Sequence, residues 1–279
     1  YLVRNQSLEL LTEDHITREA NRILRRLCET GAVLAVARDM EMAVVVRGGR
    51  TLTAYADIVV KNGGRLHLQP VGDASIAKVD AQFIAIEDGA MTGTGEVFVG
   101  SGPIDGSIRN VDGLIAPGDP NGSGFGQIGR IDIVGDLSNQ ATLAFEIGGI
   151  ASGEFDSISV SRNIYLNGTL DVGLVDLGGG TFTPQPGDTF DLITVGDSVV
   201  GTFDDIVLPV SSGSLAWMVS YNADSVQVRY GFACDADGDG DCQLNDLDAL
   251  YDAFGTAGGQ FDFDGSGVVD ADDIVGWLE

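Results

Sequence analysis

The sequence has few basic residues, and most of them lie near its start. The 279 residues include 42 Asp and Glu against 15 Lys and Arg, which gives a formal net charge of −27. No basic residue follows Arg229. A chain this acidic has no electrostatic attraction for a phosphate backbone or for an anionic membrane surface. We therefore expect no nucleic-acid partner.

Histidine and cysteine are also scarce, which limits the chemistry that the chain can perform. We expect the two histidines, His15 and His67, to be surface or packing residues. No Ser stands in a Gly-x-Ser-x-Gly motif, so the sequence shows no machinery for nucleophilic hydrolysis. The three cysteines are too few for a disulfide framework. Cys234 and Cys242 could form a disulfide or be two small apolar residues, and both alternatives stay open.

Long hydrophobic runs are missing as well. No run approaches the length of about 18 apolar residues that indicates a transmembrane helix, so we expect no membrane span. The chain begins at Tyr1, and no basic stretch followed by an apolar one marks a secretion signal. We therefore expect the N-terminus to be processed or truncated.

Glycine is abundant and separates short apolar runs. The sequence has 40 Gly, and many units consist of a strand, an Asn-Gly or Asp-Gly turn and a second strand, as around Asn62-Gly63, Asp88-Gly89 and Asn167-Gly168. These units recur roughly every 20 to 25 residues, a period that suits a β-solenoid with stacked coils. A β-sandwich of hairpins is the alternative, because Asn-Gly is also the strongest hairpin signal. We predict a β-solenoid over residues 32–232, ending in a less regular sandwich.

An amphipathic helix is predicted before this domain. One apolar stripe at helical spacing is formed by Ile16, Ala20, Ile23, Leu24 and Leu27. Gly31 stands where such a helix would end. We interpret residues 1–31 as a helical element that caps the first coil of the solenoid, with a free helix or a remnant of an upstream domain as the alternative.

Several short phrases between residues 106 and 208 share a loose pattern. They are Gly106-Ser107-Ile108, Leu114-Ile115-Ala116-Pro117-Gly118, Ala141-Thr142-Leu143, Pro186-Gly187-Asp188-Thr189-Phe190-Asp191-Leu192-Ile193 and Gly201-Thr202-Phe203. This segment resembles the closing section of autotransporter-passenger-like surface proteins. The resemblance implies a repetitive extracellular or cell-surface segment and no particular activity.

The most specific motif is a pair of loops near the C-terminus, each with the twelve-residue spacing of an EF-hand calcium loop. In such a loop, oxygens at positions 1, 3, 5, 7, 9 and 12 surround the ion, and Gly at position 6 permits the sharp turn. In the first loop these six positions hold Asp235, Asp237, Asp239, Asp241, Gln243 and Asp246. In the second loop they hold Asp262, Asp264, Ser266, Val268, Asp270 and Asp273. The spacing predicts two bound calcium ions.

Helical spacing follows each loop, and no comparable pattern precedes either one. Tandem loops with Asp at position 12 and a helix only on the exit side resemble the type I dockerin family, over residues 233–279. The resemblance implies a small calcium-binding module, with α-helices, that docks onto a cohesin domain of another protein. In that family, positions 10 and 11 of each loop help to choose the partner. Here these positions hold Leu244, Asn245, Ala271 and Asp272, which differ from the hydroxyl pair of cellulosomal members.

Two functions remain open. The first is a non-catalytic extracellular or cell-surface protein, in which a solenoid stalk or adhesion segment carries the docking module. The alternative is a fragment of a polysaccharide-degrading enzyme, a lyase or a glycoside hydrolase, since members of the dockerin family often are such enzymes. A groove along the solenoid with a carboxylate pair about 5 to 10 Å apart would favour the enzyme. The scarcity of basic residues between positions 66 and 230 speaks against a lyase.

Overall fold

The computed structural model shows a mainly β chain with one short helix, α2 (Leu244–Asp252), among the residues that it describes. These residues are 8–9, 33–38, 41–54, 57–70, 76–100, 106–118, 128–211, 214–235, 242–256, 266 and 268–274. The helix predicted within residues 1–31 lies outside them and stays a prediction.

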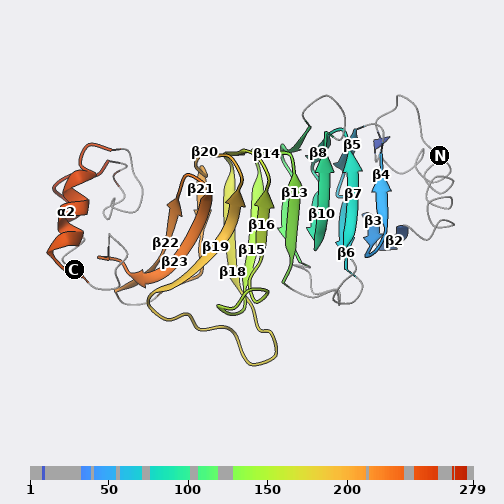
Figure 1. Ribbon diagram of the computed structural model, residues 1–279. Coiled ribbons are helices and arrows are strands. Elements are labelled where there is room, and N and C mark those ends of the chain that lie inside the picture. The colour runs from blue at the N-terminus through green and yellow to red at the C-terminus, as the bar shows by residue number, and fades with distance from the viewer. Residues whose placement is uncertain are drawn as a thin grey trace.

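Three sheets run side by side along the long axis of the molecule (Figure 1). Sheet A contains, in spatial order, β1 (Leu8–Glu9), β5 (Ile58–Lys61), β8 (Ile84–Glu87), β11 (Ser107–Asn110), β14 (Asp136–Asn139), β17 (Ile164–Leu166) and β20 (Val199–Gly201). Sheet B contains β2 (Val33–Arg38), β3 (Glu41–Arg47), β6 (Arg65–Gln69), β9 (Ala90–Gly93), β12 (Leu114–Pro117), β15 (Thr142–Ile147), β18 (Thr169–Leu174) and β21 (Asp205–Val207). Sheet C contains β4 (Thr51–Thr53), β7 (Ala77–Ala81), β10 (Gly95–Val99), β13 (Arg130–Val134), β16 (Ser157–Val160), β19 (Asp188–Val195), β23 (Ser225–Phe232) and β22 (Leu215–Tyr221).

The chain winds through these sheets as a β-solenoid. From β5 onward it visits sheets A, B and C in turn. Every strand from β5 to β21 pairs in parallel with the equivalent strand of the preceding coil. Hairpins would instead pair consecutive strands antiparallel. The predicted solenoid is therefore confirmed for these coils, in preference to the sandwich.

The coils differ in length. Hydrogen-bonded positions of adjacent coils lie 24 residues apart for Asp88 and Asp112, and 29 residues apart for Asn110 and Asn139. The predicted period of roughly 20 to 25 residues therefore fits the first of these spacings and is too short for the second.

The core is an aliphatic column inside the coils. In sheet A, one interior position is occupied in successive coils by Ile58, Ile84, Ile108, Leu137 and Ile164, all buried. Parallel strands lie about 4.8 Å apart, so equivalent side chains stack directly on one another. Burying each of these side chains contributes about 1.5–3 kcal/mol, which makes the column a main source of cohesion between coils.

The predicted Asn-Gly and Asp-Gly turns are confirmed as turns, but they join sheet A to sheet B. Asn62 and Gly63 lie between β5 and β6 with φ angles of 56° and 73°. Gly168 lies between β17 and β18 with φ at 69°, and a Cβ there would lie 2.3 Å from the carbonyl oxygen of Ala141. Left-handed backbone and close approach of the coils both favour glycine at this corner.

Two buried asparagines hold neighbouring coils together at the same corner. Asn110 Nδ2 donates to Asn139 Oδ1 at 2.7 Å and to the carbonyl oxygen of Thr142 at 3.0 Å. Asn139 Nδ2 in turn donates to the carbonyl oxygens of Ala141 at 2.9 Å and Asn167 at 2.7 Å. These bonds satisfy backbone acceptors where the sheet ladder is interrupted.

His67 is a packing residue, as predicted. It is buried on β6, and its Nδ1 lies 2.8 Å from Oγ1 of Thr92 on the next coil. His15 lies outside the described residues.

The C-terminal end of the solenoid is closed by antiparallel strands and aromatic side chains. β19 pairs with β23, and β23 with β22, so these strands extend sheet C in place of the predicted sandwich. Phe190 is fully buried there, with ring centroids 5.5 Å from Phe155, 6.1 Å from Phe182 and 5.9 Å from Trp217. These rings form one aromatic cluster at the C-terminal end of the solenoid core.

Candidate functional site

The two predicted calcium loops are described in part. Asp237, Asp239, Asp241, Asp262 and Asp264 lie outside the described residues. The structure describes the remaining seven predicted ligands, which are Asp235, Gln243, Asp246, Ser266, Val268, Asp270 and Asp273.

The aspartates at position 12 are placed in the same way in both loops. Asp246 and Asp273 are fully buried. The backbone N–H of Gln243 donates to Oδ2 of Asp246 at 2.7 Å, and that of Asp270 donates to Oδ2 of Asp273 at 2.8 Å. In each loop, the backbone N–H of position 9 donates to the carboxylate of position 12. The same kind of bond occurs in a capping box, where the side chain of the third helical residue accepts from the backbone N–H of the residue that caps the helix start. The two loops therefore share this hydrogen bond as well as their spacing.

The residue at position 1 of the first loop, Asp235, forms an ion pair with a residue of the solenoid. Asp235 is buried, and its carboxylate pairs with the guanidinium of Arg229 on β23. Arg229 Nη2 also donates to the carbonyl oxygen of Asp235 at 2.5 Å. The last basic residue of the chain thus offsets the charge of the first predicted ligand.

Cys234 and Cys242 are joined by a disulfide, with their Cα atoms 5.5 Å apart. This bond settles the alternative that the sequence left open. It closes a ring around the first seven positions of the first loop.

The residues at positions 10 and 11 lie on the surface. Leu244 is 76% exposed, and Asn245, Ala271 and Asp272 are also exposed. The residue at position 8 of the second loop, Val269, is buried instead and exchanges backbone hydrogen bonds with the turn after α2. Its carbonyl oxygen accepts from Gly255 N–H at 2.9 Å, and its N–H donates to the carbonyl oxygen of Thr256 at 3.1 Å. The loops therefore present positions 10 and 11 outward and bury position 12.

Within the described part of the chain, no group of three or more His, Cys, Asp or Glu side chains is arranged to hold a metal ion. Five of the twelve predicted ligands fall outside that part. Calcium binding stays a prediction.

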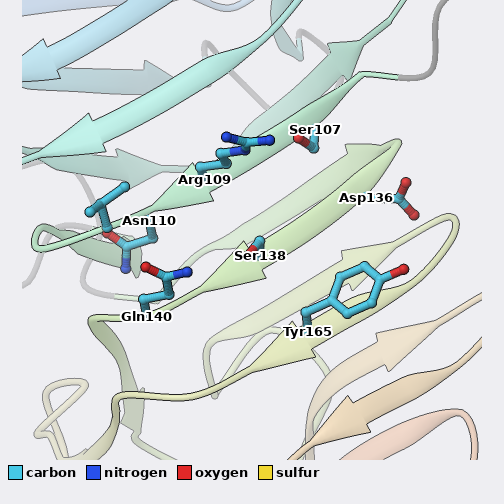
Figure 2. Close-up of a pocket in the computed structure, with 8 residues that line it drawn as sticks. Ser107, Arg109, Asn110, Asp136, Ser138, Gln140 and Tyr165 are labelled. Atoms are coloured by element: carbon cyan, nitrogen blue, oxygen red, sulfur yellow. The ribbon is translucent and has the colours of Figure 1, made fainter.

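A second candidate site is a shallow groove on the outer face of sheet A, with a volume of about 450 Å³. It is lined by Ser107, Arg109, Asn110, Val111, Asp136, Ser138, Gln140 and Tyr165 (Figure 2). These residues come from β11, β14 and β17 and from the turns that follow β11 and β14. The sequence did not indicate this groove.

The groove contains a single carboxylate among its lining residues. Asp136 accepts hydrogen bonds from the backbone N–H of Asn163 at 3.0 Å and from its Nδ2 at 3.2 Å, and Arg162 Nε lies 3.9 Å away. Acid–base glycoside hydrolysis commonly uses two carboxyl groups. The lining therefore gives no support to the predicted enzyme alternative.

A buried acid lies elsewhere, at the corner between sheets B and C. Both carboxyl oxygens of Asp156 are engaged: Oδ1 accepts from Gly129 N–H at 2.6 Å and Oδ2 from Glu146 N–H at 2.8 Å. Burial raises the pKa of Asp156 from 3.8 to about 8, the two backbone hydrogen bonds oppose this rise, and the nearby Glu146 carboxylate adds to it. Asp156 joins two coils through its backbone partners.

This raised pKa predicts a pH-dependent stability. The folded chain holds a proton on Asp156 that the unfolded chain releases, so the stabilisation is complete below pH 3.8 and is lost as the pH rises toward about 8. Between these pH values, Asp156 should lower the free energy of unfolding by up to about 1.4 kcal/mol per pH unit, and we expect Asp156→Asn to remove this slope. Urea unfolding of both proteins across this range measures the two slopes. Parallel pH profiles would contradict the assignment.

Comparison with protein-family models and with curated proteins gives no match. No helix among the described residues is long and apolar enough to cross a membrane. The resemblances to dockerins and to passenger-like proteins stay predictions from the sequence.

Proposed function

We propose that this chain is a non-catalytic extracellular or cell-surface protein, in which the β-solenoid is a stalk and residues 233–279 form a calcium-dependent docking module for a cohesin-like domain. The observation that carries the proposal is the repeated arrangement of the two loops. In both, the position-12 aspartate is buried against the N–H of position 9, while positions 10 and 11 are exposed.

The residues fit calcium in chemical type. A buried carboxylate is costly unless a cation or hydrogen bonds compensate it, and Asp246 and Asp273 are both buried. Oxygen ligands at the remaining positions would come from Asp235, Asp237, Asp239, Asp241 and Gln243 in one loop and Asp262, Asp264, Ser266, Val268 and Asp270 in the other. Calcium would compensate this excess of negative charge, which otherwise opposes folding of the segment.

Two further observations support the stalk and its location. The coils between β5 and β21 repeat one parallel arrangement, which gives an elongated body with the two ends of the solenoid far apart (Figure 1). The disulfide between Cys234 and Cys242 is typical of oxidising compartments, including the extracellular space.

The docking surface is tested by binding of the full chain to purified type I cohesin domains, with calcium or with a chelator. We expect calcium-dependent binding that weakens about tenfold or more in Leu244→Ser, because Leu244 is exposed at position 10. Val210→Ser, at a 97% exposed position of the solenoid, is the matched control and should bind like the natural chain. No binding to any cohesin, or equal binding in the chelator, would contradict docking.

A further inference from the structure

The groove on sheet A contains an arginine that differs from the other basic residues of its region. Four basic residues beyond position 65 each lie within 4.0 Å of a carboxylate: Lys78, Arg130, Arg162 and Arg229. Arg109 is exposed, and no described carboxylate forms an ion pair with it. In a chain with so many acidic residues, this leaves the guanidinium available to a ligand.

Arg109 belongs to a straight column of outward-facing residues. The register aligns Arg109 on β11 with Ser138 on β14 and Tyr165 on β17. Because adjacent parallel strands lie about 4.8 Å apart, Arg109 and Tyr165 are separated by about 10 Å along the solenoid axis. The column continues past Arg109 to Ala85 and past Tyr165 to Val200. A linear ligand could therefore lie along the axis and contact several coils.

The chemistry of the lining suits a sugar chain. Tyr165 is 46% exposed and offers an aromatic face, on which the apolar face of a sugar ring can stack. The side chains of Arg109 and Gln140 can donate hydrogen bonds to the hydroxyl groups of a sugar ring. Those of Gln140 and Ser138 can accept hydrogen bonds from such hydroxyl groups. Within the described residues, no hydrogen bond engages the side chains of Ser138, Gln140 or Tyr165. The groove volume lies within the usual range for ligand sites, about 300–1,000 Å³.

Charge favours an uncharged ligand over an acidic one. The lining contains one positive and one negative side chain, Arg109 and Asp136, whose formal charges cancel. The whole chain carries a net charge of −27, which repels anions as they approach. We infer that the groove on sheet A binds an uncharged polysaccharide along the solenoid axis, with Tyr165 stacking on one ring and Arg109 hydrogen-bonding to hydroxyls further along the chain.

The test is calorimetric titration of the full chain with cellohexaose, xylohexaose, mannohexaose and, as the anionic comparison, hexagalacturonate. A chelator is present throughout, so the result does not depend on the docking module and the two proposals can fail separately. We expect at least one of the three neutral hexasaccharides to bind. Arg109→Gln and Tyr165→Ala should each weaken this binding about tenfold or more, since each removes a direct contact.

Two variants serve as matched controls: Arg130→Gln, an exposed arginine on sheet C, and Tyr251→Ala, an exposed tyrosine on α2. Both should bind like the natural chain, and circular dichroism of all four variants should be unchanged. The inference is overturned if no neutral hexasaccharide binds at millimolar concentration or if Arg109→Gln and Tyr165→Ala bind normally. Tighter binding of hexagalacturonate than of every neutral ligand would also overturn it, by making the groove an anion site.

Discussion

Replacing Phe190 by alanine is expected to lower the free energy of unfolding by about 3–5 kcal/mol. Phe190 is fully buried in the last coil and packs against Phe155, Phe182 and Trp217. Its removal would leave a cavity that three aromatic rings cannot easily fill. Urea unfolding followed by tryptophan fluorescence measures the loss, because Trp217 reports on the same cluster.

The size of this effect follows from the position of the ring. Coils in a solenoid bury one another, so the terminal coil needs residues that cover its open interior. The exposed side chain of Val210 offers the control, and Val210→Ala should change stability by no more than about 0.5 kcal/mol. A loss below about 1 kcal/mol for Phe190→Ala would show that the aromatic cluster does not close the core.

Removing calcium is expected to have the second large effect, confined to residues 233–279. At a free calcium concentration a thousand times the dissociation constant, one bound ion stabilises the folded module by about 4 kcal/mol. In a chelator, the amides of Gln243 and Asp270 should lose protection from hydrogen exchange, because they donate to the position-12 carboxylates.

The solenoid supplies the internal control for this experiment. Amides of β13 and β16, which pair in parallel within sheet C, should exchange at the same rate with and without calcium. Equal protection of Gln243 and Asp270 under both conditions would mean that the loops fold without the ion.

Much of the solenoid could be predicted because the patterns that indicate its strands and turns lie within short stretches of the sequence. The short apolar run before Asp88-Gly89 indicated a strand, which is β8, and Asn62-Gly63 indicated a turn. The arrangement of the strands in three sheets was not predicted. Strands such as β7 (Ala77–Ala81), in which apolar and charged residues alternate, have no Asn-Gly turn before them. Only the structure showed that each coil has a third side.

The groove could not be predicted for a related reason. Arg109, Ser138 and Tyr165 align only through the register of three strands, and coils of unequal length hide this register in the sequence. Asp156 is a similar case, because nothing in its local sequence distinguishes a buried aspartate from the many exposed ones. The predicted calcium loops differ, since the proposed ligands of each lie within twelve residues and the spacing alone carries the prediction.

The central claim is that residues 233–279 form a module that binds two calcium ions. Calcium titration of the purified full chain tests it most directly. The proposal predicts two ions per chain for the natural protein and one for Asp246→Ala or Asp273→Ala, each of which loses one buried position-12 ligand. Asp248→Ala, an exposed acid on α2, should retain two. The absence of calcium uptake by the natural chain, or two ions in all three variants, would contradict the claim.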